Sequence, residues 1–168
     1  MTNPHRFSGK VAFVTGAASG IGRATAVAFA TEGAQVAILD LTENALSETA
    51  DAVRNAGAQV LVLACDVSKP DQVEAAIGRV IETFGSLDIA FNNAGVENKA
   101  APVAEIDLAE WDRILDINLR GTFVCMKHEL AQMVRQGSGV IVNTSSGAGV
   151  RGWRAEHPMP LPSTRSSA

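Results

Sequence analysis

The octapeptide TGAASGIG, from Thr15 to Gly22, is the most informative segment of this chain. It ends the apolar run KVAFVTG and opens the alanine-rich stretch GIGRATAVAFATEG, so a predicted strand turns into a predicted helix here. Its three glycines allow a tight turn and a close backbone approach to an anion. Unpaired N–H groups and the positive end of the helix dipole then favour a pyrophosphate. A glycine connection without a ligand is the alternative, but its place at the first strand–helix junction favours binding.

The same alternation of strand and helix continues as far as Gly149. The apolar pattern predicts strands over residues 10–16, 34–40, 59–67, 87–95 and 138–147. It predicts helices over residues 20–33, 42–57, 69–85 and 108–134. Thr42 is the expected N-cap of the second helix. Trp111 and Phe123 are expected to lie in the core. Continuous apolar strands imply burial on both faces, which is typical of a parallel sheet. The predicted fold is therefore α/β, a doubly wound, Rossmann-like parallel sheet.

Asp40 adds a second feature of a nucleotide site. It ends the second predicted strand about 20 residues beyond the glycines, where an acid can accept hydrogen bonds from both adenosine ribose hydroxyls. The same carboxylate would repel a 2′-phosphate, and neither Ser19 nor Leu41 supplies a cation for one. These residues predict NAD rather than NADP as cofactor, with a plain strand-end aspartate as the alternative.

Five short motifs follow one another along the chain. They are TGAASGIG, CDV at 65–67, NNAG at 92–95, NLRG at 118–121 and IVNTSSGAG at 141–149. Any one of them can arise by chance, whereas all five in this order and spacing form a specific signal. On these motifs, residues 10–152 resemble the short-chain dehydrogenase/reductase family in its NAD-preferring form. The resemblance implies one partial dinucleotide-binding domain over residues 1–152, with a sheet incomplete at its C-terminal edge.

The resemblance also implies an activity and a set of site residues. In the family, a hydride passes between a nicotinamide cofactor and an alcohol or carbonyl substrate. Ser146, with Ser145 as the alternative, takes the place of the serine that hydrogen-bonds the substrate oxygen, and Asn118 that of the asparagine that holds a water. Cofactor contacts are expected from Gly16, Ser19, Gly20, Ile21, Gly22, Asp40, Asp66, Val67, Asn92, Ala94 and Gly95.

Each of these motif residues also has a simpler interpretation. Asp66 can be a turn acid that caps the next helix, and Asn92 can be a turn residue. Asn118 can be a polar residue inside a helix, although an interior asparagine offers the backbone competing hydrogen bonds. Ser146 can simply begin a loop. The functional interpretation rests on all of these residues occurring together.

The family's catalytic pair does not carry over. Its tyrosine is the general acid/base, and a lysine four residues later lowers the tyrosine pKa. The pair belongs near Pro158 and Met159, but this chain has no tyrosine and its last lysine is Lys127. The helix with this pair, two further strands and the substrate-binding segment are also missing. We therefore expect little or no turnover from residues 1–168 alone.

The last residues, 153–168, do not continue the pattern. Prolines at 158, 160 and 162 exclude a helix, and the segment is expected to be a disordered, non-homologous tail. We interpret it as the right gene read in the wrong frame. Reading from the third base of the Pro158 codon permits Tyr-Ala-x-x-Lys followed by His or Tyr, at the place where the missing pair belongs.

Composition limits the class of protein and its partners. Hydrophobic residues make up 46% of the sequence and charged residues 19%, as in an ordinary globular domain. The net charge of −4 argues against nucleic acid or an anionic membrane as main partner. The N-terminal MTNPHRFSGK has no apolar run, so neither signal peptide nor membrane span is expected. Cys65 and Cys125 are expected to be free thiols in a reducing cytoplasm.

Three classes of function remain open. The first is an NAD-dependent oxidoreductase acting on a small alcohol or carbonyl, as a homo-oligomer in many members of the family. The second is a dinucleotide-binding relic or regulatory module, and the third is a non-functional fragment. No metal site is expected, because His5, His128 and His157 form no ligand-like cluster.

Overall fold

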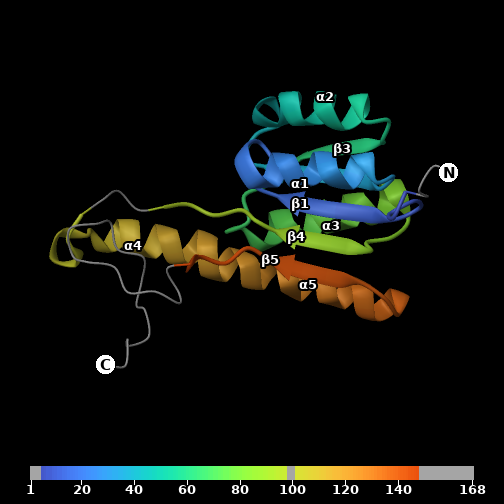
Figure 1. Cartoon of the computed structure of the whole chain (residues 1–168). Coiled ribbons are helices and arrows are strands. Elements are labelled where there is room, and N and C mark those ends of the chain that lie inside the picture. Colours follow the sequence, from blue (N-terminus) through green and yellow to red (C-terminus); the bar gives the residue numbers. More distant parts are fainter. Residues whose placement is uncertain (1–4, 98–100, 148–168) are drawn as a thin grey trace, which may run out of the picture.

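A parallel sheet of five strands forms the centre of the structure (Figure 1). The computed structural model describes residues 5–97 and 101–147, so the predicted tail over 153–168 lies outside the described residues. The strands lie in the order β3-β2-β1-β4-β5, and every neighbouring pair is parallel. Their bounds are β1 (Val11–Thr15), β2 (Gln35–Asp40), β3 (Val60–Ala64), β4 (Ile89–Asn92) and β5 (Val140–Asn143). The predicted Rossmann-like α/β fold is confirmed.

Helices cover both faces of this sheet (Figure 1). Helices α1 (Gly20–Thr31) and α2 (Ser47–Asn55) pack on one face, and α3 (Pro70–Phe84) and α5 (Thr122–Gln136) on the other. Short 3₁₀ turns η1 (Asn44–Leu46) and η2 (Val103–Glu105) precede α2 and α4. The side chains of residues 11–14 in β1 alternate between the two cores, and all are buried, which explains why these four residues are apolar.

The long helix predicted over residues 108–134 consists of three segments. Helix α4 (Leu108–Leu115) extends beyond the sheet in Figure 1, the π-helical segment η3 (Asp116–Gly121) follows, and α5 continues the helix. The expectation that Phe123 is a core residue is wrong, because its side chain is 64% exposed. Helix α5 buries the face of Val124, Cys125, Glu129 and Met133, and Phe123 points away from that face. Trp111 is half-buried.

The strand order has a topological switch point between β1 and β4, and the region outside the carboxyl ends of these two strands is called the crevice below. The chain passes from β1 to β2 on one side of the sheet and from β4 to β5 on the other. In an open parallel sheet, ligands bind outside the carboxyl ends of the strands at such a switch point. The glycine-rich turn follows β1 and the NNAG motif begins in β4, so the fold brings two of the five motifs to this crevice.

Strand β5 lies at one edge of the sheet. Within residues 5–97 and 101–147 it pairs with β4 alone, and Val140 and Val142 are 59% and 49% exposed. Among these residues the outer edge of β5 therefore lacks a partner strand, and its surface is apolar.

Candidate nucleotide-binding site

The glycine-rich turn has the backbone geometry that its sequence predicts. Gly16 and Gly20 adopt positive φ angles of 63° and 52°, which side-chain-bearing residues rarely take. Ser19 is extended and exposed, and α1 starts directly after it at Gly20. The first turn of α1 carries no acidic residue. The free N–H groups and the dipole of α1 therefore meet no acidic side chain from the first turn of the helix itself, which favours anion binding there.

Gly22 and Gly16 are needed for a second reason, close packing. A Cβ atom on Gly22 would lie 2.1 Å from the carbonyl oxygen of Gly16, and one on Gly16 would lie 2.9 Å from Ala94 Cα. Both distances are shorter than real contacts allow. Glycine at these positions lets helix α1 approach the end of β1, and lets both approach the segment after β4.

Hydrogen bonds fasten the NNAG segment to the glycine-rich turn. The buried Thr15 hydroxyl oxygen accepts from the N–H groups of Asn93 and Ala94, each at 3.0 Å. The side-chain Nδ2 of Asn93 donates to the carbonyl oxygens of Thr15 and Gly16, each at 3.3 Å. Sequence reasoning missed this role of Asn93. The side chains that follow neighbouring strand ends meet only in the folded sheet, so the doublet Asn92–Asn93 alone does not show which residue faces the turn.

Asp40 lies at the end of β2, next to the same turn. Its Oδ2 accepts from the N–H of Ala18 and its Oδ1 from the N–H of Leu41, both at 2.9 Å. The side chain is only half-buried, and each carboxylate oxygen keeps a free lone pair for a further donor. Asp40 thus combines a structural contact with an accessible negative charge at the position where the sequence predicts a ribose contact.

Arg23 and Thr49 stabilise the glycine-rich turn through hydrogen bonds, a role that sequence reasoning did not find. Thr49 is buried on α2, and its hydroxyl donates to Ala17 O at 2.8 Å. Arg23 donates from Nε to Thr49 Oγ1 at 3.0 Å and from Nη2 to the carbonyl oxygen of Ala18, and it pairs with Glu48 at 2.8 Å. These contacts join residues distant in sequence, and no local motif signals them.

Asp66 and Val67 follow β3, which ends at Ala64 rather than at the predicted residue 67. The Asp66 carboxylate accepts from the N–H and the hydroxyl of Ser68, at 2.9 and 2.7 Å, and this turn leads into α3. Val67 is buried against Gly121, where a Cβ atom would lie 2.8 Å from Val67 Cγ2. Their predicted cofactor contacts remain predictions.

Asn118 lies on the π-helical segment η3 and holds the chain beyond the NNAG motif. Its Oδ1 accepts from Val96 N–H and its Nδ2 donates to Val96 O, both at 2.8 Å. Gly95 is exposed and lies next to this side chain. The side-chain amide therefore pairs with the backbone as a neighbouring strand would, and its predicted part in holding a water remains a prediction.

Asn92 and Ser146 occupy different environments from each other. Asn92 is buried, and its Nδ2 donates to Glu129 Oε2 at 2.9 Å and to Asn143 Oδ1 at 3.0 Å. Ser146 is exposed, a short way beyond the end of β5. Thr144 connects the two regions, since its N–H donates to Asn92 O at 2.9 Å and its hydroxyl to Asn93 Oδ1 at 3.2 Å. The folded chain thus brings the start of the Ser146 segment to the crevice.

Comparison with known proteins identifies the family. A family model described as short chain dehydrogenase matches residues 10–158. The chain belongs to this family. Among its relatives, levodione reductase of Leifsonia aquatica is 44% identical over 149 residues, which cover 88% of this chain and 56% of the relative. Cis-4-hydroxycyclohexanecarboxylate dehydrogenase of Sinomonas cyclohexanicum is 47% identical over 146 residues, covering 87% of this chain and 58% of the relative.

Solved structures of short-chain dehydrogenases share this fold. The crystal structure of levodione reductase matches with a TM-score of 0.86 at 42% identity, covering 90% of this chain and 59% of that one. NAD⁺-bound xylitol dehydrogenase matches with a TM-score of 0.87 at 40% identity, covering 90% and 58%. This short-chain dehydrogenase sequence therefore spans somewhat more than half the length of the relatives that it matches.

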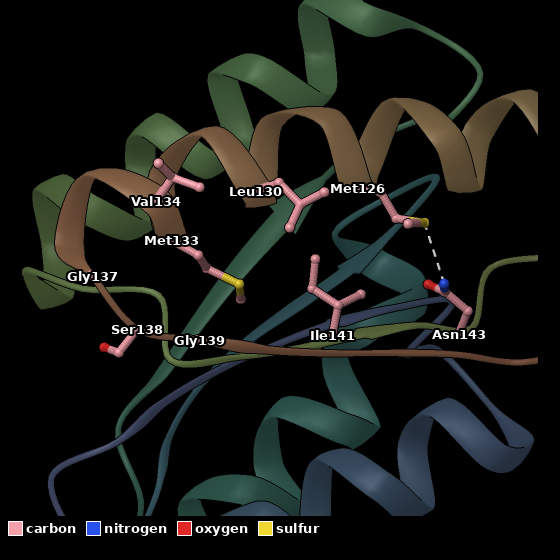
Figure 2. Close-up of a pocket in the computed structure, with 9 residues that line it drawn as sticks. All are labelled: Met126, Leu130, Met133, Val134, Gly137, Ser138, Gly139, Ile141 and Asn143. Atoms are coloured by element: carbon pink, nitrogen blue, oxygen red, sulfur yellow. Dashed lines mark hydrogen bonds between the residues drawn. The ribbon is translucent and has the colours of Figure 1, made fainter.

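A separate groove lies between α5 and β5 (Figure 2). Its volume is about 500 Å³, and none of its lining residues belongs to the glycine-rich turn. The residues that line it are Met126, Leu130, Met133, Val134, Gly137, Ser138, Gly139, Ile141 and Asn143. The groove is mostly apolar and lies along the unpaired edge of this short-chain dehydrogenase sheet.

Membrane-spanning helices and metal-ligand clusters are both missing from the part of the chain that the structure describes. None of its helices combines the length and the apolar character needed to cross a bilayer. Nor do three or more His, Cys, Asp or Glu side chains in that part come together as metal ligands. Both cysteines are free and buried, and burial raises the pKa of the Cys65 thiol to about 11.

Proposed function

We propose that this chain binds NAD in the crevice between β1 and β4, and that the whole protein is an NAD-dependent oxidoreductase acting on a small alcohol or carbonyl compound. One observation carries the proposal. The half-buried Asp40 carboxylate is fastened by Ala18 N–H to the glycine-rich turn, so a ribose acceptor and a pyrophosphate seat share one rigid unit.

Different residues of the crevice would bind different parts of the dinucleotide. The N-terminus of α1, from Gly20, faces the pyrophosphate, and Gly16 and Gly22 keep side chains out of its way. Asp40 accepts from the adenosine ribose hydroxyls, and Asp66 and Val67 lie toward the adenine. Bound NAD would supply the hydride acceptor. The role of this chain is to bind and orient it.

The negative charge of Asp40 favours NAD over NADP. A 2′-phosphate placed on the ribose would meet the Asp40 carboxylate, and two negative charges at close range repel each other. The nearby cation Arg23 is paired with Glu48 at 2.8 Å and does not offset this repulsion fully. In support, the xylitol dehydrogenase that shares this fold has NAD⁺ bound in its crystal structure.

We further propose that residues 1–168 by themselves turn over slowly or not at all. Without a positioned tyrosine as acid/base, proton transfer loses a factor of roughly 10²–10⁴. The sequence has no tyrosine at all. The alternative is that this chain is a nucleotide-binding relic or regulatory module, and its lack of a tyrosine is the observation that favours this. We place the protein in the cytoplasm and propose that it self-associates.

Calorimetric titration of the full chain with NAD and with NADP tests the proposal. We expect NAD to bind at least about tenfold more tightly than NADP, because the Asp40 carboxylate repels the 2′-phosphate of NADP. An assay with NAD and a panel of cyclic and open-chain alcohols, run on the same sample, tests turnover. Binding without turnover favours the module, whereas no binding by a folded chain rejects the proposal.

A further inference from the structure

Glu129 is an acidic side chain in the core of the molecule. It lies on α5, facing the sheet, and its exposed fraction is 0%. Asn92 Nδ2 donates a hydrogen bond to its Oε2 at 2.9 Å. A carboxylate buried in this way is costly unless it is neutralised or well paired. No cation forms an ion pair with it among the described residues.

Two atoms of this pair lack hydrogen-bond partners. Glu129 Oε1 and Asn92 Oδ1 are both buried and unpaired in the described part of the chain. Both are acceptors as long as the carboxyl is ionised, so the pair has one acceptor too many on each side. A neutral carboxyl turns one of its oxygens into an O–H donor and so reduces this excess of acceptors.

The surroundings of Glu129 favour the neutral form. Burial raises the pKa of Glu129 to about 7, and the hydrogen bond from Asn92 offsets this only in part. The titratable neighbour in the same core is the Cys125 thiol, whose pKa burial also raises, and beyond it Cys65. Strands β4 and β5 carry no titratable side chain. The charged groups of α3 and η3 are all solvent-exposed: Asp71, Glu74, Arg79, Glu82, Asp116 and Arg120.

The hydrogen bond from Asn92 connects Glu129 with the end of β4, which borders the crevice. Asn92 is the last residue of β4, and its Nδ2 also donates to Asn143, the last residue of β5. Asn143 in turn donates to Met126 Sδ at 3.2 Å, the dashed line in Figure 2. The next residue after Asn92 is Asn93, which holds the glycine-rich turn and accepts from Thr144. Glu129 thus anchors Asn92 at the end of β4, and Asn92 in turn holds Asn143 at the end of β5.

We propose that Glu129 is a positioning residue of the nucleotide crevice: as a neutral acid it holds the Asn92 side chain that joins the end of β4 to the end of β5, and its ionisation loosens this junction. The link to cofactor affinity rests on the function proposed above. The link to the strand ends does not, because it concerns the fold alone. Stability and binding therefore need separate measurements.

The stability test compares urea unfolding of the full chain at pH values from 5 to 8.5. An unfolded glutamate has its ordinary pKa, so between that value and about 7 the folded chain holds more protons, and stability falls as pH rises. For wild type we expect the unfolding equilibrium constant to rise by roughly 10²-fold across this range through Glu129. In Glu129→Gln, a neutral side chain of the same shape, that rise disappears. Glu82→Gln, whose parent side chain is 77% exposed, keeps it.

Infrared spectroscopy of the wild-type chain tests the protonation state without any variant. With ¹³C-labelled glutamate, we expect a protonated carboxylic acid band at pH 6 that disappears as pH rises past 7, and that is missing in Glu129→Gln. The absence of this band in wild type at pH 6, or an unfolding profile of Glu129→Gln that follows wild type, overturns the proposal.

NAD titration at pH 6 and pH 8 tests the link to the crevice. We expect affinity to fall between these values more in wild type than in Glu129→Gln. Equal pH dependence in the two proteins would confine Glu129 to a structural role and overturn the positioning claim. If neither protein binds NAD while the infrared band and the flattened profile are present, the proposed function fails and the tie between β4 and β5 stands.

Discussion

Asp40 Oδ2 accepts a hydrogen bond from the backbone N–H of Ala18 at 2.9 Å, across the boundary between β2 and the glycine-rich turn. The bond gives Asp40 a role even before any cofactor arrives, because it fixes the turn relative to the sheet. The carboxylate remains half-exposed and able to accept from a sugar hydroxyl. Loop geometry and ribose recognition therefore depend on one side chain.

Asp40→Asn separates these two roles. Asparagine retains an oxygen for Ala18 N–H, but its NH2 group cannot accept from Leu41 N–H and the charge is lost. The bond to the turn is therefore kept while the charge-assisted bonds to the ribose are weakened. We expect NAD affinity to fall about tenfold, and the preference for NAD over NADP to shrink because the 2′-phosphate no longer meets a carboxylate. Calorimetric titration with both nucleotides measures both effects. Asp71→Asn on the exposed start of α3 is the matched control, and an unchanged ratio of affinities would contradict the role given to Asp40.

Gly22→Ala tests the close packing of α1 against the turn. The new Cβ would lie 2.1 Å from Gly16 O, so the helix must shift, at a cost of about 1–3 kcal/mol and with loss of NAD binding. Gly78→Ala is the control in α3, where nothing lies within 4 Å of the new Cβ. That change should stabilise the chain by about 0.5–1 kcal/mol. Urea unfolding of both variants gives the comparison, and equal effects would mean that the turn is not closely packed.

Asn118→Ala tests the pairing of η3 with the segment after β4. The substitution removes both 2.8 Å hydrogen bonds to Val96. Because this region is exposed, water replaces them, and we expect a loss in stability of only about 1 kcal/mol. Hydrogen exchange at the Val96 amide should nevertheless become much faster. Asn55→Ala at the exposed end of α2 serves as the control, and unaltered exchange at Val96 would rule out the pairing.

The two thiols should be unreactive in the folded chain. Burial raises the pKa of Cys65 to about 11 and raises that of Cys125 as well. The thiolate is the reactive form, so alkylation at pH 8 should be about 100-fold slower than for an unperturbed thiol. In urea both should react at the ordinary rate. Mass spectrometry of samples treated with iodoacetamide counts the modified residues, and rapid labelling of either cysteine without urea would show that it is not buried.

The coding DNA tests the interpretation of residues 153–168. If the tail is read in the wrong frame, the third base of the Pro158 codon is T and that of Pro162 is A, which gives Tyr-Ala-x-x-Lys in the shifted frame. Sequencing settles this directly. A chain expressed in the shifted frame should then oxidise alcohols with NAD, and replacing its new tyrosine with phenylalanine should abolish that activity. Any base other than T at the third position of the Pro158 codon rules out the frameshift interpretation.

The order of the elements, the parallel sheet and the position of the glycine-rich turn could all be predicted before the structure was known. These features follow from local properties: apolar runs, helix periodicity, and glycine where φ is positive or a Cβ does not fit. The spacing from the glycines pointed to Asp40, and the resemblance to the family pointed to Asn118. The prediction for Phe123 was wrong, because an apolar side chain on a helix does not reveal which face meets the sheet until its neighbours are in place.

The pairing of polar side chains, in contrast, became clear only in the folded molecule. Asn92 and Asn93 are identical residues side by side, yet one turns into the core toward Glu129 and the other holds the glycine-rich turn. Arg23 with Thr49, and Asn118 with Val96, likewise join segments that are distant in the chain. Strand and helix preferences act over a few residues, whereas these contacts arise where parallel strands end at the same edge of a sheet. Their partners are therefore fixed by packing and not by spacing along the chain.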